Sequence, residues 1–132
     1  MKQEEKELLL KDLCGRLPYG VMIMVAAREE PEQLLKVDFE FVNPSFSTKT
    51  WLMCYTEDVK PFLRRMSSMT EEEKNEFARF FTYGWYDTDT YTVFQEVPNI
   101  IDWLNKKMFD YRGLIPMGLA IEVTEENNFY KE

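Results

Sequence analysis

The chain has 132 residues, of which 45% are hydrophobic and 15% aromatic, and it carries a formal net charge of −8. This length predicts a single domain over residues 1–132, with a core rich in aromatic rings. The excess of carboxylates argues against direct binding to nucleic acids or anionic membranes, because both need clustered Lys and Arg. It fits good solubility, a basic partner protein, or mimicry of a nucleic acid.

The sequence contains no histidine. Histidine is the usual general base at neutral pH, so Ser-His-Asp and Cys-His catalytic sets are excluded within this chain. The five glycines are scattered and form no phosphate-binding loop, and no metal-ligand spacing is present. We therefore expect no cofactor and no metal. Cys14 and Cys54 lie in apolar patterns and are predicted to be buried thiols, with a disulfide between them left open.

No run of about 18 apolar residues is present, so no membrane-spanning helix is expected. The N-terminal stretch MKQEEKELLLKDL is acidic and amphipathic, unlike a signal peptide. These features predict a cytoplasmic protein without membrane association.

In the first third of the chain the apolar pattern predicts one helix and two strands. Residues 3–16 have helical spacing and end near a glycine and a proline. Residues 21–26 are continuously apolar, which predicts a strand covered on both faces. Residues 28–35 are charged and predict a loop or a helical turn. Residues 37–41 alternate apolar and acidic, which predicts a strand paired antiparallel with 21–26 across a long connection.

The best local signal belongs to a helix over residues 70–81. Thr70 and Glu73 have the spacing of a capping box, and Gly84 is a natural stop. Upstream, residues 43–48 predict a loop and residues 50–55 a third strand.

A shorter helix is predicted to begin at Asp58 or Thr56, with Pro61 in its first turn. It would carry Arg64 and Arg65 and form a hairpin with the 70–81 helix. The two arginines would then pair with the acidic start of the second helix, or they would form an anion or partner site.

Residues 84–97 interleave aromatic side chains with Asp and Thr, which fits a strand over 91–97 or an ordered loop. The Asp87 and Asp89 pair fits a turn better than a metal site, because the glycine and glutamate of an EF-hand are missing. Asn99 is predicted to cap a helix that ends before Gly113.

A last strand is expected at 119–123, and the tail over 124–132 is predicted to fray. Together these elements predict an α+β fold, in which three to four helices pack on a small, mainly antiparallel sheet of three to five strands.

Three segments carry a resemblance to known sequences: KDLCGRLPYGV at 11–21, KPFLRRMSSMTEEE at 60–73, and DYRGL at 110–114 together with GLA at 118–120. As a set they resemble a group of small proteins of gut Bacteroidetes, often carried on prophages and other mobile elements, with no known activity. The resemblance implies a bacterial or phage cytosolic setting. The chain departs from the group at Arg65, where relatives carry proline.

The absence of a catalytic motif favours a non-enzymatic accessory protein that binds another protein. The candidate contact residues are Arg64, Arg65, Tyr111 and Arg112, because exposed rings and guanidinium groups often bind partners. In the simpler alternative, Tyr111 packs and Arg112 pairs with Asp110 or a helix end. Two other functions stay open: an acidic decoy for a nucleic-acid-binding protein, and a carboxylate-dependent enzyme.

Overall fold

The computed structural model describes the backbone of residues 1–39, 43–51, 53–84 and 90–130, and their side chains apart from those of 82–84 and 90–95. In chain order the elements are α1 (Gln3–Arg16), η1 (Leu17–Tyr19), β1 (Met22–Val25), β2 (Glu32–Gln33), β3 (Lys36–Asp38), β4 (Ser45–Ser47), η2 (Thr56–Asp58), β5 (Val59–Leu63), η3 (Met66–Ser68), α2 (Glu71–Gly84), α3 (Thr90–Lys106) and β6 (Ile121–Glu122), where η marks a 3₁₀ turn.

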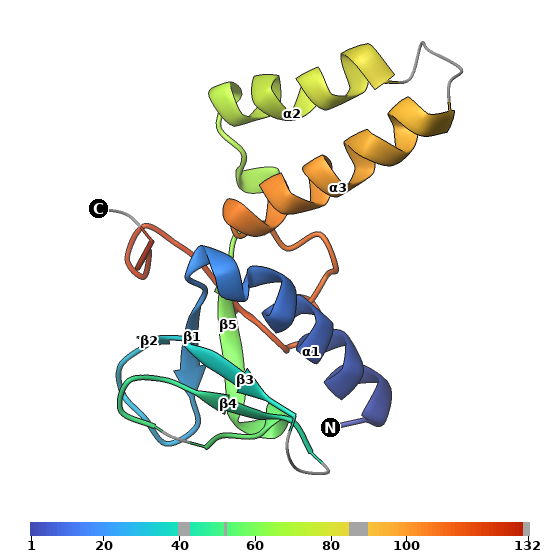
Figure 1. Ribbon diagram of the computed structural model, residues 1–132. Helices are drawn as coiled ribbons and strands as arrows, with labels where there is room; N and C mark the ends of the chain where they lie inside the picture. Colours follow the sequence, from blue (N-terminus) through green and yellow to red (C-terminus); the bar gives the residue numbers. More distant parts are fainter. Residues whose placement is uncertain (40–42, 52, 85–89, 131–132) are drawn as a thin grey trace.

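The predicted α+β class is confirmed. Four strands form a mixed sheet in the order β2-β1-β5-β6, with β1 antiparallel to both of its neighbours and β5 parallel to β6. A separate antiparallel pair is made by β3 and β4 (Figure 1). The strand predicted at 21–26 and the last strand at 119–123 are both present, each shorter than expected.

Helix α1 has the predicted bounds and packs on the sheet. Its buried side chains Leu9 and Leu13 join a core with Ile23 of β1, Leu63 of β5 and Phe46 of β4. These contacts bring both sheets and α1 around a single core. Burial of apolar surface there is the main source of stability.

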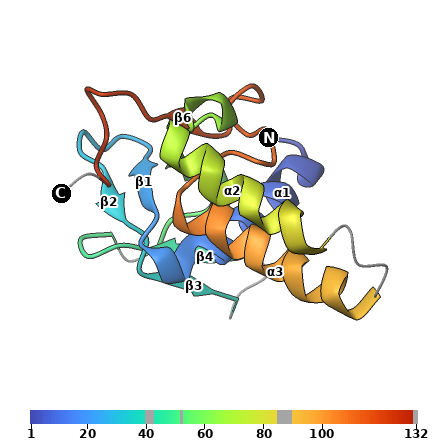
Figure 2. The same cartoon turned by 90° about the horizontal axis from the view of Figure 1, so that it is seen from above.

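Helices α2 and α3 run side by side as a hairpin that stands beyond the end of the sheet (Figures 1 and 2). The predicted capping box is confirmed: the Glu73 amide donates to Thr70 Oγ1 at 3.1 Å, and the Thr70 amide donates to Glu73 Oε1 at 3.0 Å. The ring of Trp103 in α3 stacks with the rings of Phe77 in α2 and Phe109 just after α3. None of the described helices is both long and apolar enough to cross a membrane.

The helix predicted near Pro61 is wrong, because residues 59–63 form β5 in the middle of the sheet. The Ala26 amide donates to the Asp58 carbonyl, and bonded pairs alternate along an antiparallel ladder, so Pro61 falls opposite Ile23 at a non-bonded position. Its missing N–H therefore costs no bond to β1. A proline at the first turn of a helix is tolerated for the same reason, which is why the sequence pattern was ambiguous.

The strand or loop expected at 91–97 is also wrong, because α3 begins at Thr90 and runs through Pro98. Asn99 therefore lies inside a helix and caps nothing. Tertiary packing of the hairpin overrides the β-propensity of this aromatic stretch. Asp87 and Asp89 lie outside the described residues, as do Trp85 and the side chains of 90–95.

The predicted pairing of 37–41 with β1 is wrong for the described residues 37–39. Strand β3 ends at Asp38 and pairs with β4, which lies in the stretch predicted to be a loop. Phe39 is 62% exposed, and Phe41 lies outside the described residues. Of the strand predicted at 50–55, one antiparallel bridge from Cys54 to Phe46 is described, and the predicted loop at 28–35 contains the short strand β2.

The tail predicted to fray is anchored by its aromatic residues. The Tyr130 hydroxyl accepts from the Met22 amide at 2.9 Å and donates to the Phe62 carbonyl at 2.7 Å. Phe129 meets the ring of Phe62 edge-on, with centroids 5.1 Å apart. The tail thus bridges β1 and β5 where β5 changes its partner to β6.

Candidate functional site

Arg64 follows β5 and is engaged within the molecule. Its two terminal nitrogens donate to the carboxylate of Glu73 at 2.8 and 2.7 Å, and its guanidinium lies 4.3 Å from the centroid of the Phe109 ring. The hydrogen bonds from Arg64 lower the pKa of Glu73 to about 2. Arg64 therefore joins the end of β5 to the first turn of α2. The predicted pairing with the acidic start of this helix is correct for Arg64, but Arg64 follows a strand and not the helix expected there.

Arg65 points to a different partner. Its guanidinium pairs with Glu122 of β6, and about half of the Arg65 side chain is exposed. Arg64 and Arg65 therefore form no joint anion site. Of the four predicted contact residues, Arg65 is the most accessible to a partner.

Tyr111 and Arg112 lie together in the loop after α3, as predicted. The Tyr111 ring lies near the guanidinium groups of Arg16 and Arg112, at 5.2 and 5.1 Å from its centroid. The Tyr111 hydroxyl donates to Asn105 Oδ1 at 2.9 Å, and Arg112 Nε is 3.5 Å from Asp12 Oδ1. These contacts agree with the simpler alternative for Tyr111, which packs, whereas Arg112 pairs with Asp12 instead of Asp110.

A buried ion pair beneath this loop escaped the sequence analysis. Arg16 donates through Nε and one terminal nitrogen to Asp12 at 2.9 and 3.0 Å, and it also donates to the Phe109 carbonyl at 2.6 Å. Both side chains are fully buried. The available signal was the i, i+4 spacing of an Asp and an Arg beside the buried leucines of α1. Without contacts from other elements, that spacing is equally typical of a solvated helix face.

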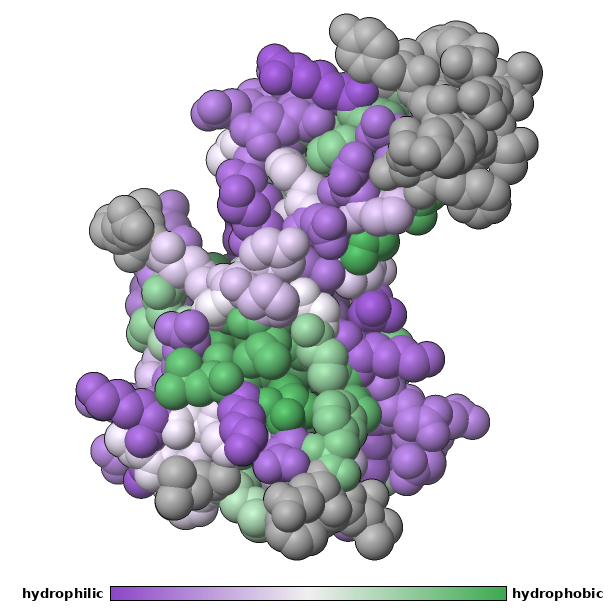
Figure 3. Space-filling model, in the orientation of Figure 1, coloured by the Kyte–Doolittle hydropathy of each residue, from purple (hydrophilic) through white to green (hydrophobic). Residues whose placement is uncertain are grey.

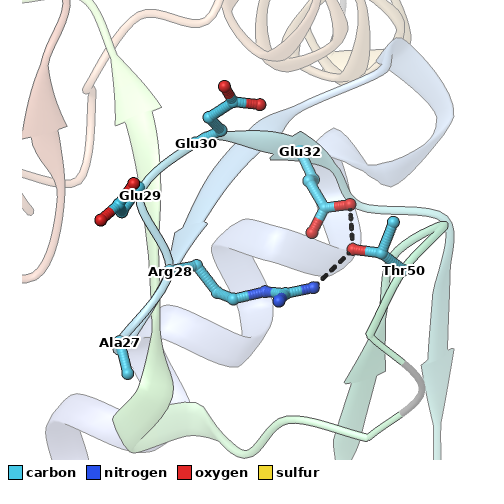
Figure 4. Close-up of a pocket in the computed structure, with 6 residues that line it drawn as sticks. All are labelled: Ala27, Arg28, Glu29, Glu30, Glu32 and Thr50. Carbon is cyan, nitrogen blue, oxygen red and sulfur yellow. Dashed lines mark hydrogen bonds between the residues drawn. The ribbon is translucent and has the colours of Figure 1, made fainter.

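A hollow with a volume of about 500 Å³ lies at the β1–β2 turn (Figure 4). Thr50 Oγ1 accepts from Arg28 at 2.8 Å and donates to Glu32, and this second bond is the main cause of the lowered pKa of Glu32. The carboxylates of Glu29 and Glu30 point away from this pair (Figure 4). The hollow therefore brings no two carboxylates together in the way acid–base catalysis uses them.

Neither cysteine is activated. Both are free thiols, with Cys54 buried and Cys14 partly exposed. Burial raises the pKa of Cys54 to about 11 and also raises the pKa of Cys14, so little thiolate forms near neutral pH. Among the residues that the structure describes, no cluster of three or more Cys, Asp or Glu side chains is placed to hold a metal ion.

A further candidate surface is apolar. Figure 3 shows it over β3 and beside α1, on the side of the molecule seen in Figure 1. Val37 lies in β3, and two exposed apolar residues flank this strand: Leu35 before it is 54% exposed and Phe39 after it is 62% exposed. We call this surface the apolar face and define it by the exposed or half-buried apolar residues in and beside β3 and along one side of α1 and its C-cap, which are Leu10, Cys14, Leu17, Leu35, Val37 and Phe39. Sequence reasoning missed it, because the alternation around Val37 predicted a strand whose apolar side chains turn inward.

Comparison of the chain with protein-family models, with curated proteins and with solved structures finds no match. The resemblance to a mobile-element group of Bacteroidetes therefore stays a prediction.

Proposed function

We propose that this protein is a non-enzymatic accessory protein that binds another protein through the apolar face. Two observations carry the proposal. Leu35 and Phe39, on either side of β3, are more than half exposed, and an apolar surface extends over β3 beside α1 (Figure 3). Single exposed apolar side chains are common, but a contiguous patch of this kind typically marks an interaction site. The setting we propose is the cytoplasm of a bacterium, within a prophage or another mobile element.

The construction of the apolar face supports this role. Three of its residues also pack against the buried core: Leu10, Leu17 and Val37. The core therefore holds this surface in place before a partner binds. A preformed surface loses little conformational entropy on binding. Large apolar side chains at the centre of such a surface are the usual energetic anchors of an interface.

The partner we propose carries positive charge around an apolar contact. The chain has 24 acidic and 16 basic residues, so a basic partner is attracted over a long range and associates faster at low salt. An acidic decoy would bind by charge alone, whereas an apolar interface retains affinity when salt screens the charges.

The test is recovery of partners by the tagged protein from its native host, at low and at high salt. A specific partner should be recovered in both conditions, and its affinity should then be measured with purified proteins. The double variant Leu35→Glu/Phe39→Glu should weaken binding by at least tenfold. The matched control is Met117→Glu/Val97→Glu, which alters two side chains of similar exposure outside the apolar face.

Equal affinity in both double variants would overturn the assignment of the apolar face. Partners recovered only at low salt would favour the charge-driven decoy instead. Circular dichroism of each variant checks that the fold is retained.

A further inference from the structure

A small pocket lies between the N-terminal half of α1 and the 3₁₀ turn η2. Its volume is about 100 Å³, which is small for a ring system and suits one aliphatic side chain. Its lining is mixed: Leu10, Pro44 and Tyr55 supply apolar surface, and the other lining residues are Gln3, Lys6, Glu7, Asn43, Thr56 and Glu57. Interface anchors are side chains that fill such small pockets on the partner.

The pocket is continuous with the apolar face along one side of α1. Residues three, four and seven apart share one side of a helix, so Glu7, Leu10, Cys14 and Leu17 form a single stripe. This stripe flanks the buried leucines of α1 and leads from the pocket to the neighbourhood of β3. Leu10 belongs to both the pocket and the apolar face, so one bound segment can contact both.

Glu7 is the carboxylate at the border of the pocket that stands outside the ion pair there. The Lys6 ammonium pairs with the Glu57 carboxylate, and this hydrogen bond is the main reason that the pKa of Glu57 is lowered. The positive charge of the N-terminal ammonium lowers the pKa of Glu57 as well, so Lys6 and the N-terminus both act on Glu57, whereas exposed Glu7 stays outside this pair. A cation beside an apolar anchor is the complementary arrangement.

We propose that this pocket receives one aliphatic side chain of the partner protein, and that a Lys or Arg next to this anchor pairs with Glu7. The proposal rests on the function proposed above and specifies which chemistry the partner presents. It commits to an aliphatic anchor flanked by basic residues, as opposed to an acidic or purely polar segment.

The test uses the ¹⁵N-labelled full chain and three blocked tripeptides: acetyl-Lys-Leu-Lys-amide, acetyl-Glu-Leu-Glu-amide and acetyl-Lys-Ala-Lys-amide. The basic leucine peptide should shift the amide resonances of Leu10, Tyr55 and Thr56 at least threefold more than either of the others. Equal shifts from all three peptides, or shifts confined to other parts of the chain, would overturn the proposal.

A charge reversal gives a second measurement. Glu7 is exposed, so Glu7→Lys should leave the fold intact while reversing the preference between the basic and the acidic leucine peptide. Glu126→Lys is the matched control, because this exposed carboxylate lies in the C-terminal tail. An unchanged preference in Glu7→Lys would contradict the pairing with Glu7.

The two proposals fail separately. If partner binding needs Leu35 and Phe39 but no tripeptide shifts the pocket resonances, the pocket proposal is wrong and the apolar face stands. If the tripeptides bind as expected while the partner tolerates the Leu35→Glu/Phe39→Glu variant, the pocket stands and the function assigned to the apolar face is wrong.

Discussion

At the scale of single residues, the dominant feature is a charge held inside the molecule. The Arg16 guanidinium is fully buried, and a buried charge requires a compensating partner. Asp12 supplies it with two hydrogen bonds, and the Phe109 carbonyl takes a third. The guanidinium groups of Arg16 and Arg112 also lie against the ring of Tyr111. The predicted binding residues Tyr111 and Arg112 thus contribute to the packing of α1 against the loop after α3.

Removal of Asp12 should therefore be costly. In Asp12→Ala the Arg16 charge stays buried without its partner, and we expect a loss of about 3–5 kcal/mol in the free energy of unfolding. The double variant Asp12→Leu/Arg16→Met removes both charges and should lose far less. Urea unfolding measures both. Lys6→Gln, which breaks a surface ion pair, is the control and should change stability by less than about 1 kcal/mol.

At the scale of elements, β5 organises the sheet. It pairs with β1 up to Pro61 and with β6 from Phe62 onward. The ladder between β1 and β5 therefore ends at Pro61. Tyr130 fills the gap with a hydroxyl that serves both Met22 and Phe62. A side chain from the end of the chain thus provides hydrogen bonds that a regular ladder would have provided.

Loss of the Tyr130 hydroxyl should weaken this junction. Tyr130→Phe keeps the ring but leaves the Met22 amide and the Phe62 carbonyl unpaired, so we expect a loss of about 1–3 kcal/mol. Hydrogen exchange at the Met22 amide should also become faster. Tyr19→Phe is the control, because the Tyr19 side chain is more exposed. Equal stability of both variants would show that the hydroxyl bridge contributes little.

At the scale of the whole molecule, the α2–α3 hairpin is joined to the sheet through the segments on either side of it. The Arg64 amide donates to the Met108 carbonyl and the Asp110 amide donates to the Arg64 carbonyl, each at 2.8 Å, so the two connecting segments are paired. The Arg64 side chain adds the bond to Glu73 and the contact with Phe109. Arg64 thus positions the hairpin and is a poor candidate for binding a partner.

This connection should depend on pH in the acidic range. The hydrogen bonds from Arg64 depress the pKa of Glu73 from 4.5 to about 2 in the folded protein. The resulting stabilisation is therefore complete above about pH 4.5 and is lost as the pH falls toward 2. Glu73→Gln should cost about 2 kcal/mol at pH 6, as expected for hydrogen bonds to a charged group, and much less at pH 2.5.

Urea unfolding of Glu73→Gln at several pH values measures this difference. Glu72→Gln, on an exposed carboxylate one residue earlier, should show no such trend. A pH-independent cost of Glu73→Gln would contradict the role of the Arg64 pair.

Most of the candidate site could not be predicted from the sequence. The prediction that Arg64 pairs with the acidic start of a helix was correct, because charge and proximity along the chain already suggested it. The apolar face was missed, because whether Leu35 and Phe39 turn inward depends on how β3 lies against the core. The Asp12–Arg16 pair was missed for a similar reason, since burial of an ion pair requires other elements to cover it.

The sequence by itself determined the α+β class, the bounds of α1, the capped start of α2 and the apolar strand β1. These depend on helical spacing, capping chemistry and short-range hydrophobic pattern, which are local properties. The tertiary structure decided that residues 59–63 form a central strand, that α3 begins at Thr90, and that β3 pairs with β4. These outcomes depend on contacts between residues far apart in the chain, where packing outweighs local propensities that favour two structures almost equally.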